Sequence, residues 1–147
     1  MIPTLRGHAR RAIETLSLPA AAKRERRRDA AGLPAVDPGS ARVLPAVLRW
    51  LALAQDRSAS HDGGVARDFS LRHGWATSYP ETTGYIIPTL LAYARRSGQS
   101  EFRDRALRMA DWLVGIQLPG GGFQGGKIDS VPVVPVTFNT GQILIGL

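Results

Sequence analysis

The chain has 147 residues, 44% of them hydrophobic, and no cysteine, which suits one domain and excludes disulfides and thiolate metal sites. Its formal net charge is +7, and the first 42 residues hold nine basic against four acidic side chains. No apolar run approaches the roughly 18 residues that cross a bilayer, and no apolar segment of a secretion signal follows Met1. We therefore expect a cytoplasmic protein with no transmembrane segment.

The first 42 residues form a basic N-terminal region. Apolar residues recur at helical spacing over positions 5–17, and the proline-containing stretch 18–40 is typical of a linker that can carry one short charged helix. The strongest charge run is KRERRR at positions 23–28. No aromatic side chain is interleaved with it for stacking on bases, so we interpret it as a solvated face and expect no nucleic-acid partner.

Residues 43–147 have the pattern of a helical domain. Apolar positions recurring at intervals of three and four predict helices near 41–56, 84–97 and 101–117. The first two helices are joined by a long polar connection, and a connection of this length inside a compact domain is usually functional or partly structured. A further apolar helix is predicted to open at Asn139.

The stretch WATSYPETTGYIIPTLL, residues 75–91, begins as an aromatic and polar loop and ends as an apolar run. Pro80 disfavours helix at the residue before it, and either of the two threonines that follow can cap a helix starting near Gly84. Glu81 thus falls beside the helix N-terminus, whose partial positive charge favours a carboxylate. We expect Glu81 to lie, with the aromatic side chains of the loop, at the mouth of a buried helix.

The sequence contains an internal repeat. The pattern Trp-Leu-x-x-x-Gln starts at Trp50 and again at Trp112, 62 residues later, and a glycine-rich turn follows each copy. A Thr-Gly helix start then occurs at Thr83 and again at Thr140, 57 residues later. Repeats of this kind bury their faces by stacking on neighbours, and two hairpins are too few to close a core. We therefore expect the N-terminal part of a longer repeat protein, or a truncated product of one.

The same argument predicts association through the last helix, because apolar side chains there have no following hairpin to cover them. These side chains are Ile143, Leu144, Ile145 and Leu147.

A family resemblance rests on three of these segments. The segment ALRMADWLVGIQ at 106–117, followed by GGGF at 120–123, resembles the repeat of α/α-toroid proteins such as terpenoid cyclases and protein prenyltransferases. Similar helical-hairpin rings occur in six-hairpin glycosidases and sugar epimerases. The stretch 74–85 resembles proteins found among bacterial exopolysaccharide biosynthesis genes. Over residues 43–147, the resemblance implies an all-α fold whose helical hairpins form part of an α/α toroid, incomplete in this chain.

The resemblance also implies where a site would lie. In such rings the loops before the inner helices line the central cavity, which would place Glu81 and Tyr85 at the cavity. The second copy of the repeat would place Asn139 and Gln142 there as well.

Two chemistries of these families are not supported by the residues present. The Asp-x-Asp-Asp acid motif of terpenoid cyclases is absent, and so is the Asp/Cys/His zinc set of the prenyltransferase β subunits. The three histidines, His8, His61 and His73, are too scattered to indicate a metal site. We therefore expect no metal and no cofactor.

Carbohydrate chemistry suits the residues better, because sugar sites combine aromatic platforms with carboxylates and amides. Asp62 and Glu81 are the obvious candidates for the two carboxylates of a glycosidase, which lie about 5 to 9.5 Å apart. Asp62 is equally a turn residue, and Glu81 is equally a first-turn helix acid. The candidate sugar-binding residues are Trp75, Tyr79, Tyr85, Phe123, Asn139 and Gln142.

Three functions remain open at this point. The first is a protein that acts on or binds a saccharide intermediate of exopolysaccharide synthesis, and the second is a terpenoid-cyclase-like enzyme acting on a polyprenyl chain. The third is a noncatalytic helical-repeat scaffold. A polar cavity with paired carboxylates would favour the first function, and an apolar, aromatic-walled cavity the second.

Overall fold

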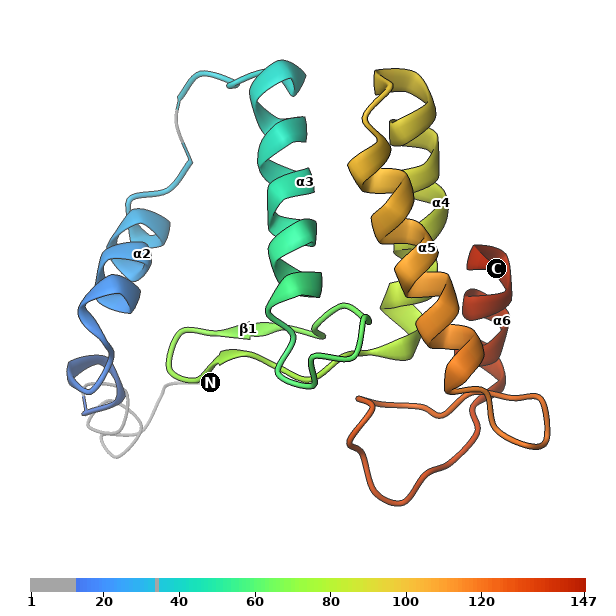
Figure 1. The fold of residues 1–147 in the computed structure, drawn as a ribbon. Coiled ribbons are helices and arrows are strands. Elements are labelled where there is room, and N and C mark those ends of the chain that lie inside the picture. The colour runs from blue at the N-terminus through green and yellow to red at the C-terminus, as the bar shows by residue number, and fades with distance from the viewer. Residues whose placement is uncertain (1–12, 34) are drawn as a thin grey trace.

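The computed structural model describes residues 13–33 and 35–147, and most of this part of the chain is helical, as expected (Figure 1). Most of the predicted helix over 5–17 lies outside the described residues. Within the part that is described, residues 13–16 are helical. The elements are α2 (Ala20–Ala30), α3 (Ser40–Asp56), β1 (Phe69–Ser70), β2 (Gly74–Trp75), α4 (Pro80–Ser97), α5 (Ser100–Gly115) and α6 (Thr137–Gly146).

Helix α4 begins at Pro80, four residues before the predicted start. Tyr79 is the extended residue in front of the helix, and proline suits the first helical position because its φ is already helical and no N–H is needed there. The hydroxyls of Thr82 and Thr83 donate hydrogen bonds back to the Tyr79 carbonyl from inside the first turn. The predicted end is confirmed, since Gly98 terminates the helix with a left-handed φ of 72°.

Helices α4 and α5 are antiparallel neighbours, and α6 lies beside α4 and runs in the same direction (Figure 1). The close approach of α4 and α6 depends on Gly84, because a Cβ added there would lie 2.8 Å from the Cα of Ile143. The core is filled by apolar side chains from α3 to α6 and the turns between them. They include Leu48, Val65, Ile87, Leu90, Phe102, Ala106, Met109, Trp112, Leu113, Phe123 and Ile143.

Helix α3 is tied to α5 by a charged side chain. Arg105 of α5 has only 11% of its side chain exposed and forms two parallel hydrogen bonds to the Asp56 carboxylate, at 2.7 and 2.8 Å. Its Nε donates to Glu101 at 2.9 Å. This geometry lowers the pKa of Asp56, chiefly through the hydrogen bonds from Arg105.

The long connection between α3 and α4 contains a small antiparallel β-hairpin, which the sequence did not predict. Phe69 pairs with Trp75, and Ser70 with Gly74. The rings of Trp50, Phe69 and Trp75 form an aromatic cluster beneath α3, with centroids 4.6 to 5.9 Å apart. The connection and the loop before α6 lie at the same end of the helices (Figure 1). Among the described helices, none combines the length and hydropathy needed to cross a membrane.

Candidate functional site

The connection from α3 to α4 and the connection from α5 to α6 begin with the same hydrogen-bonded corner. In the first, the side-chain amide of Gln55 donates to the Gly63 carbonyl at 3.0 Å, and in the second Gln117 donates to the Gly121 carbonyl at 2.9 Å. The repeated glutamine of the sequence therefore has a physical role, because it closes the glycine turns that follow α3 and α5.

The threonine that recurs after 57 residues completes the corner. The hydroxyl of Thr83 accepts a hydrogen bond from the backbone N–H of Val65 at 3.0 Å, and the hydroxyl of Thr140 accepts one from Phe123, also at 3.0 Å. Each threonine therefore ties the end of a glycine turn to the first turn of the next helix. The two corners position the starts of α4 and α6 in the same way.

The predicted residues Glu81, Tyr85 and Gln142 lie on one face of the helix pair. Glu81 and Tyr85 are four residues apart in α4 and therefore share a side of the helix, opposite its buried positions. Tyr85 is 42% exposed, and Glu81 is half-buried. Phe138 and Gln142 occupy the equivalent positions of α6, 57 residues later. We call these four side chains the α4–α6 face.

Asn139, another predicted site residue, is buried in the first turn of α6 and is only 5% exposed. It lies on the same side of α6 as Ile143 and Gly146, the side that packs against Gly84 of α4. Its amide Nδ2 has no hydrogen-bond partner among the described residues. A buried donor without an acceptor lowers the stability of the fold, so a polar partner at this position would be bound favourably.

Asp62 is engaged in holding the first loop. Its Oδ1 accepts hydrogen bonds from the Ser78 hydroxyl at 2.6 Å and from the Gly64 N–H at 3.1 Å. Ser58 and Ser60 extend this network to Ser78 at 2.7 and 3.0 Å, and both Ser58 and Ser78 are fully buried. Sequence reasoning missed the three serines, because no periodicity or motif links positions on the two sides of a loop.

The remaining predicted residues separate into two environments. Trp75 belongs to the aromatic cluster with Trp50 and Phe69, and Tyr79 is half-buried with the guanidinium of Arg67 5.7 Å from its ring centroid. Phe123, predicted to stack on a sugar, is instead fully buried in the core. Its position directly after the glycine turn points its ring between the helices and leaves no exposed surface for a ligand.

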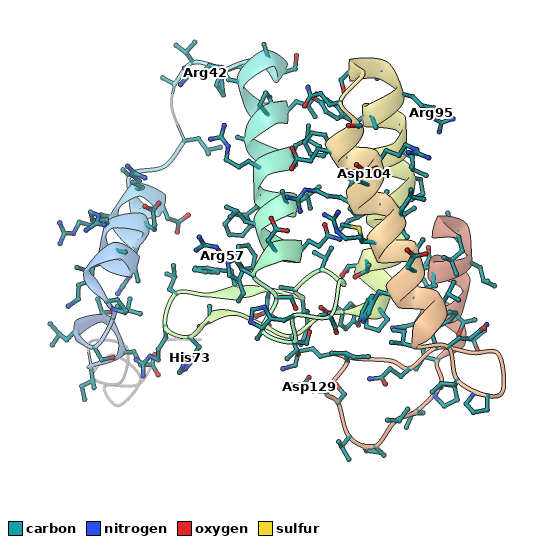
Figure 2. The ribbon with its side chains drawn as sticks, viewed as in Figure 1. Arg42, Arg57, His73, Arg95, Asp104 and Asp129 are labelled. Carbon is teal, nitrogen blue, oxygen red and sulfur yellow. The ribbon has the colours of Figure 1, made fainter. Side chains whose placement is uncertain are left out.

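The second loop lies against the first at the corner end of the helices. The hydroxyl of Thr77 donates to Asp129 at 2.8 Å, and this hydrogen bond lowers the pKa of the Asp129 carboxyl. The backbone N–H of Ile128 also donates to the Ser78 carbonyl at 2.8 Å. Figure 2 shows Asp129 in this loop, below the helices and far from Arg95 and Arg42 at their other end. Nothing in the sequence indicated this contact between loops.

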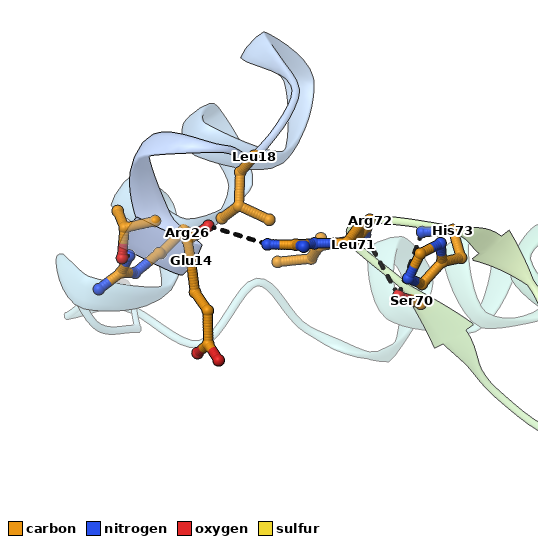
Figure 3. A pocket seen from close by; sticks show the side chains of 8 residues that line it. Glu14, Leu18, Arg26, Ser70, Leu71, Arg72 and His73 are labelled. Atoms are coloured by element: carbon orange, nitrogen blue, oxygen red, sulfur yellow. Dashed lines mark hydrogen bonds between the residues drawn. The ribbon is translucent and has the colours of Figure 1, made fainter. Parts of the chain in front are cut away.

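A separate cavity of about 550 Å³ lies between the helical segment before α2 and the β-hairpin (Figure 3). The guanidinium of Arg72 donates to the Ser17 hydroxyl at 2.5 Å and to the Glu14 carbonyl at 3.4 Å across it. None of the predicted site residues lines this cavity. Its lining comprises Glu14, Thr15, Leu18, Arg26, Ser70, Leu71, Arg72 and His73.

A scan against protein-family models and searches of curated proteins and of solved structures returned no match to the chain. The function must therefore be argued from the geometry. Within residues 13–33 and 35–147, no group of three or more histidine, aspartate or glutamate side chains is arranged to hold a metal ion.

Proposed function

We propose that this protein is an α/α-toroid type of helical-hairpin protein that binds a saccharide intermediate of bacterial exopolysaccharide synthesis on its α4–α6 face. The observation that carries the proposal is the composition of that face, which combines a carboxylate, an amide and two aromatic rings at equivalent positions of neighbouring parallel helices. Helices α4 and α6 lie side by side with their starts at the same end, an arrangement that suits the inner helices of a toroid (Figure 1).

The chemistry of the face matches what a sugar ring requires. Tyr85 is 42% exposed and Phe138 59% exposed, so both rings are available to stack on the apolar side of a pyranose. Glu81 and Gln142 supply an acceptor and an amide for hydroxyl groups.

A further feature of the site supports Glu81 over Asp62 as the carboxylate that contacts the sugar. Asp62 already accepts two hydrogen bonds from its own loop, whereas Glu81 is half-buried on the side of α4 opposite its buried positions. A polyprenyl chain has no hydroxyl groups to bond the carboxylate of Glu81 or the amide of Gln142, so a saccharide is favoured over a polyprenyl substrate.

The test is saccharide binding by the whole chain, measured by calorimetry against a panel of neutral and acidic exopolysaccharide fragments. Glu81→Gln and Tyr85→Ala should each weaken binding roughly tenfold, the loss that corresponds to about 1.4 kcal/mol. Asp104→Asn is the matched control, because Asp104 is an exposed carboxylate on α5 (Figure 2). If no fragment binds, or if the Glu81 and Tyr85 variants bind like the parent while remaining folded, the proposal is wrong.

A further inference from the structure

The two hairpins already form one interface with each other, and its parts can be named. The first hairpin is α3, α4 and the loop between them, and the second is α5, α6 and their loop. The indole of Trp112 lies on the glycine turn of the first hairpin, 2.5 Å from where a Cβ of Gly64 would be. On α4, Ile87 and Leu90 are 2% and 1% exposed. At this interface the second hairpin thus contributes one side of α5, and the first hairpin contributes its glycine turn and α4.

The α5 residues that form this interface have counterparts on α3, and these counterparts are exposed. Four α5 residues at this interface, Arg105, Ala106, Met109 and Trp112, are at most 9% exposed. Their counterparts 62 residues earlier are Val43, Leu44, Val47 and Trp50, which are 44%, 47%, 47% and 50% exposed. Leu44 lines a pocket with Thr89 and Tyr93 of α4 and therefore lies on the α4 side of α3. We call Val43, Val47 and Trp50 the α3 face. A groove along it is lined by Pro38, Arg42, Val43, Ala46, Val47 and Trp50.

The α4 part of this interface also has a counterpart on the second hairpin, in α6, and this counterpart is open as well. Leu144 and Leu147, the counterparts of Ile87 and Leu90, are 60% and 52% exposed. A Cβ at Gly141 would meet nothing within 4 Å, whereas its counterpart Gly84 is in contact with α6. A Cβ at Gly122, the counterpart of Gly64, would already meet Pro135 at 3.4 Å, so the glycine turn is less open than the helix. We call Gly141, Leu144 and Leu147 the α6 face. Of the apolar residues predicted to be open on α6, only Ile143 is buried, because it packs against Gly84.

The ion pair between Arg105 and Asp56 at the existing interface is replaced consistently on the two open faces. The counterpart of Arg105 is Val43, and the counterpart of Asp56 is Leu118. An ion pair between the hairpins would thus become an apolar pair between an α3 face and an α6 face. This paired change leaves no buried charge without a partner, which would otherwise be costly.

We propose that the α3 face of one copy of this chain docks on the α6 face of a second copy, repeating the interface between the two hairpins. Helix α2 stands on the side of α3 that faces away from α4 and α5 (Figure 1). It is poorly suited to cover the α3 face, since it is arginine-rich and only Ala22 in it is buried. The loops also match, because exposed apolar residues of the β-hairpin would meet exposed valines before α6. These residues are Phe69 and Leu71 on one side and Val131, Val133 and Val134 on the other.

An interface of this kind is heterologous, since the two surfaces that meet are different. Each added copy leaves one α3 face and one α6 face open, so the assembly grows until it closes into a ring or continues as a filament. A symmetric dimer through two α6 faces would instead stop at two chains. This difference provides the test.

The experiment uses one variant on each face and light scattering on the full chain. The parent should increase in mass with concentration above the 15.9 kDa of one chain. Val47→Glu, on the α3 face, and Leu144→Glu, on the α6 face, should each remain monomeric alone. When the two variants are mixed, the intact α6 face of the first and the intact α3 face of the second should form a dimer of one chain each. Val114→Glu, at a residue of α5 that is 62% exposed and belongs to neither face, should associate like the parent.

The proposal is overturned if the parent stays monomeric up to millimolar concentration, if either single variant associates like the parent, or if the mixed variants stay monomeric. Circular dichroism melting of each variant shows whether it is folded. Val43→Glu and Leu147→Glu serve as second variants on the α3 and α6 faces if a first one does not fold. Saccharide binding by Leu144→Glu is measured separately, so this proposal and the proposed function can fail independently.

Discussion

The two corners of this protein have the same hydrogen bonds in different surroundings. In both, a glutamine closes a glycine turn and a threonine ties the end of that turn to the next helix. In the first, Trp112 presses on Gly64, whereas in the second a Cβ at Gly122 would be 3.4 Å from Pro135 and 3.5 Å from Thr140. The comparison teaches that a repeated sequence repeats its local geometry, while the neighbouring helix decides how tightly each copy is packed.

The largest expected effect is at the glycine under the indole. Gly64→Ala should lower the free energy of unfolding by about 3 kcal/mol, because the new methyl group overlaps a buried ring and the helix carrying it must move. Gly122→Ala should cost less than about 1 kcal/mol, since its neighbours are at ordinary or slightly short contact distances. Urea unfolding of the two variants measures the difference, and equal losses would mean that the corners do not differ in packing.

A second pair of glycines compares helices α4 and α6. Gly84→Ala should destabilise by about 2 kcal/mol, because the added Cβ would be 2.8 Å from the Cα of Ile143 and would push α6 away. Gly141→Ala should stabilise by roughly 0.5–1 kcal/mol, since alanine is the better helix former and the space around Gly141 is open. Both are measured by urea unfolding at concentrations where the chain is monomeric. A destabilising Gly141→Ala would show that the α6 face is covered.

The threonines test the shared part of the corner. Thr83→Val should cost about 2 kcal/mol, because it leaves the buried N–H of Val65 without an acceptor. Thr140→Val should cost about 1 kcal/mol, since Thr140 is partly exposed and water can replace the hydroxyl. Hydrogen exchange of the Val65 and Phe123 amides should accelerate in the respective variant. Unchanged exchange at both amides would show that the threonine hydroxyls do not hold the corner.

The smallest effect concerns the charged contact, which is present in only one of the equivalent places. The folded pKa of Asp56 lies below its ordinary value of 3.8, so the unfolded chain binds the proton first as the pH falls. The contact therefore stabilises fully above about pH 4–5 and is lost as the pH falls through the folded pKa. Asp56→Asn should cost about 1 kcal/mol at pH 7, a small value because the carboxylate is half exposed. The parent and the variant should converge in acid. A difference that persists at pH 2 would point to packing instead of charge.

Much of the helical framework was predictable because its signals are local. Apolar spacing placed α3, α4 and α5 within a few residues, and Gly98 ended α4 as predicted. The Trp-Leu-x-x-x-Gln and Thr-Gly patterns indicated two hairpins, and both proved to be parts of the same hydrogen-bonded corner. The start of α4 lies four residues before the predicted one, because Tyr79 is the residue just outside the helix and Pro80 is its first residue, whereas Thr82 or Thr83 was predicted as the cap.

The candidate site was predicted less completely, and the reason lies in burial. Glu81, Tyr85 and Gln142 share an exposed face because helical spacing fixes their direction once the buried side of each helix is known. The burial of Phe123, the serine network around Asp62 and the contact between Thr77 and Asp129 depend on segments brought together from 16 or more residues away. Such contacts have no periodicity along the chain.

The sequence by itself determined where the helices lie, that the hairpin is repeated, and which residue types recur at each corner, since dihedral preferences and hydrophobic spacing act over a few residues. Only the tertiary structure decided which copy of each residue is covered. Trp112 is 9% exposed and Trp50 is 50% exposed in the same sequence pattern, because the first hairpin presents a glycine turn to the indole of Trp112, whereas the indole of Trp50 meets the rings of Phe69 and Trp75 and stays half exposed. Burial is a property of neighbours, and neighbours are chosen by the packing of the whole chain.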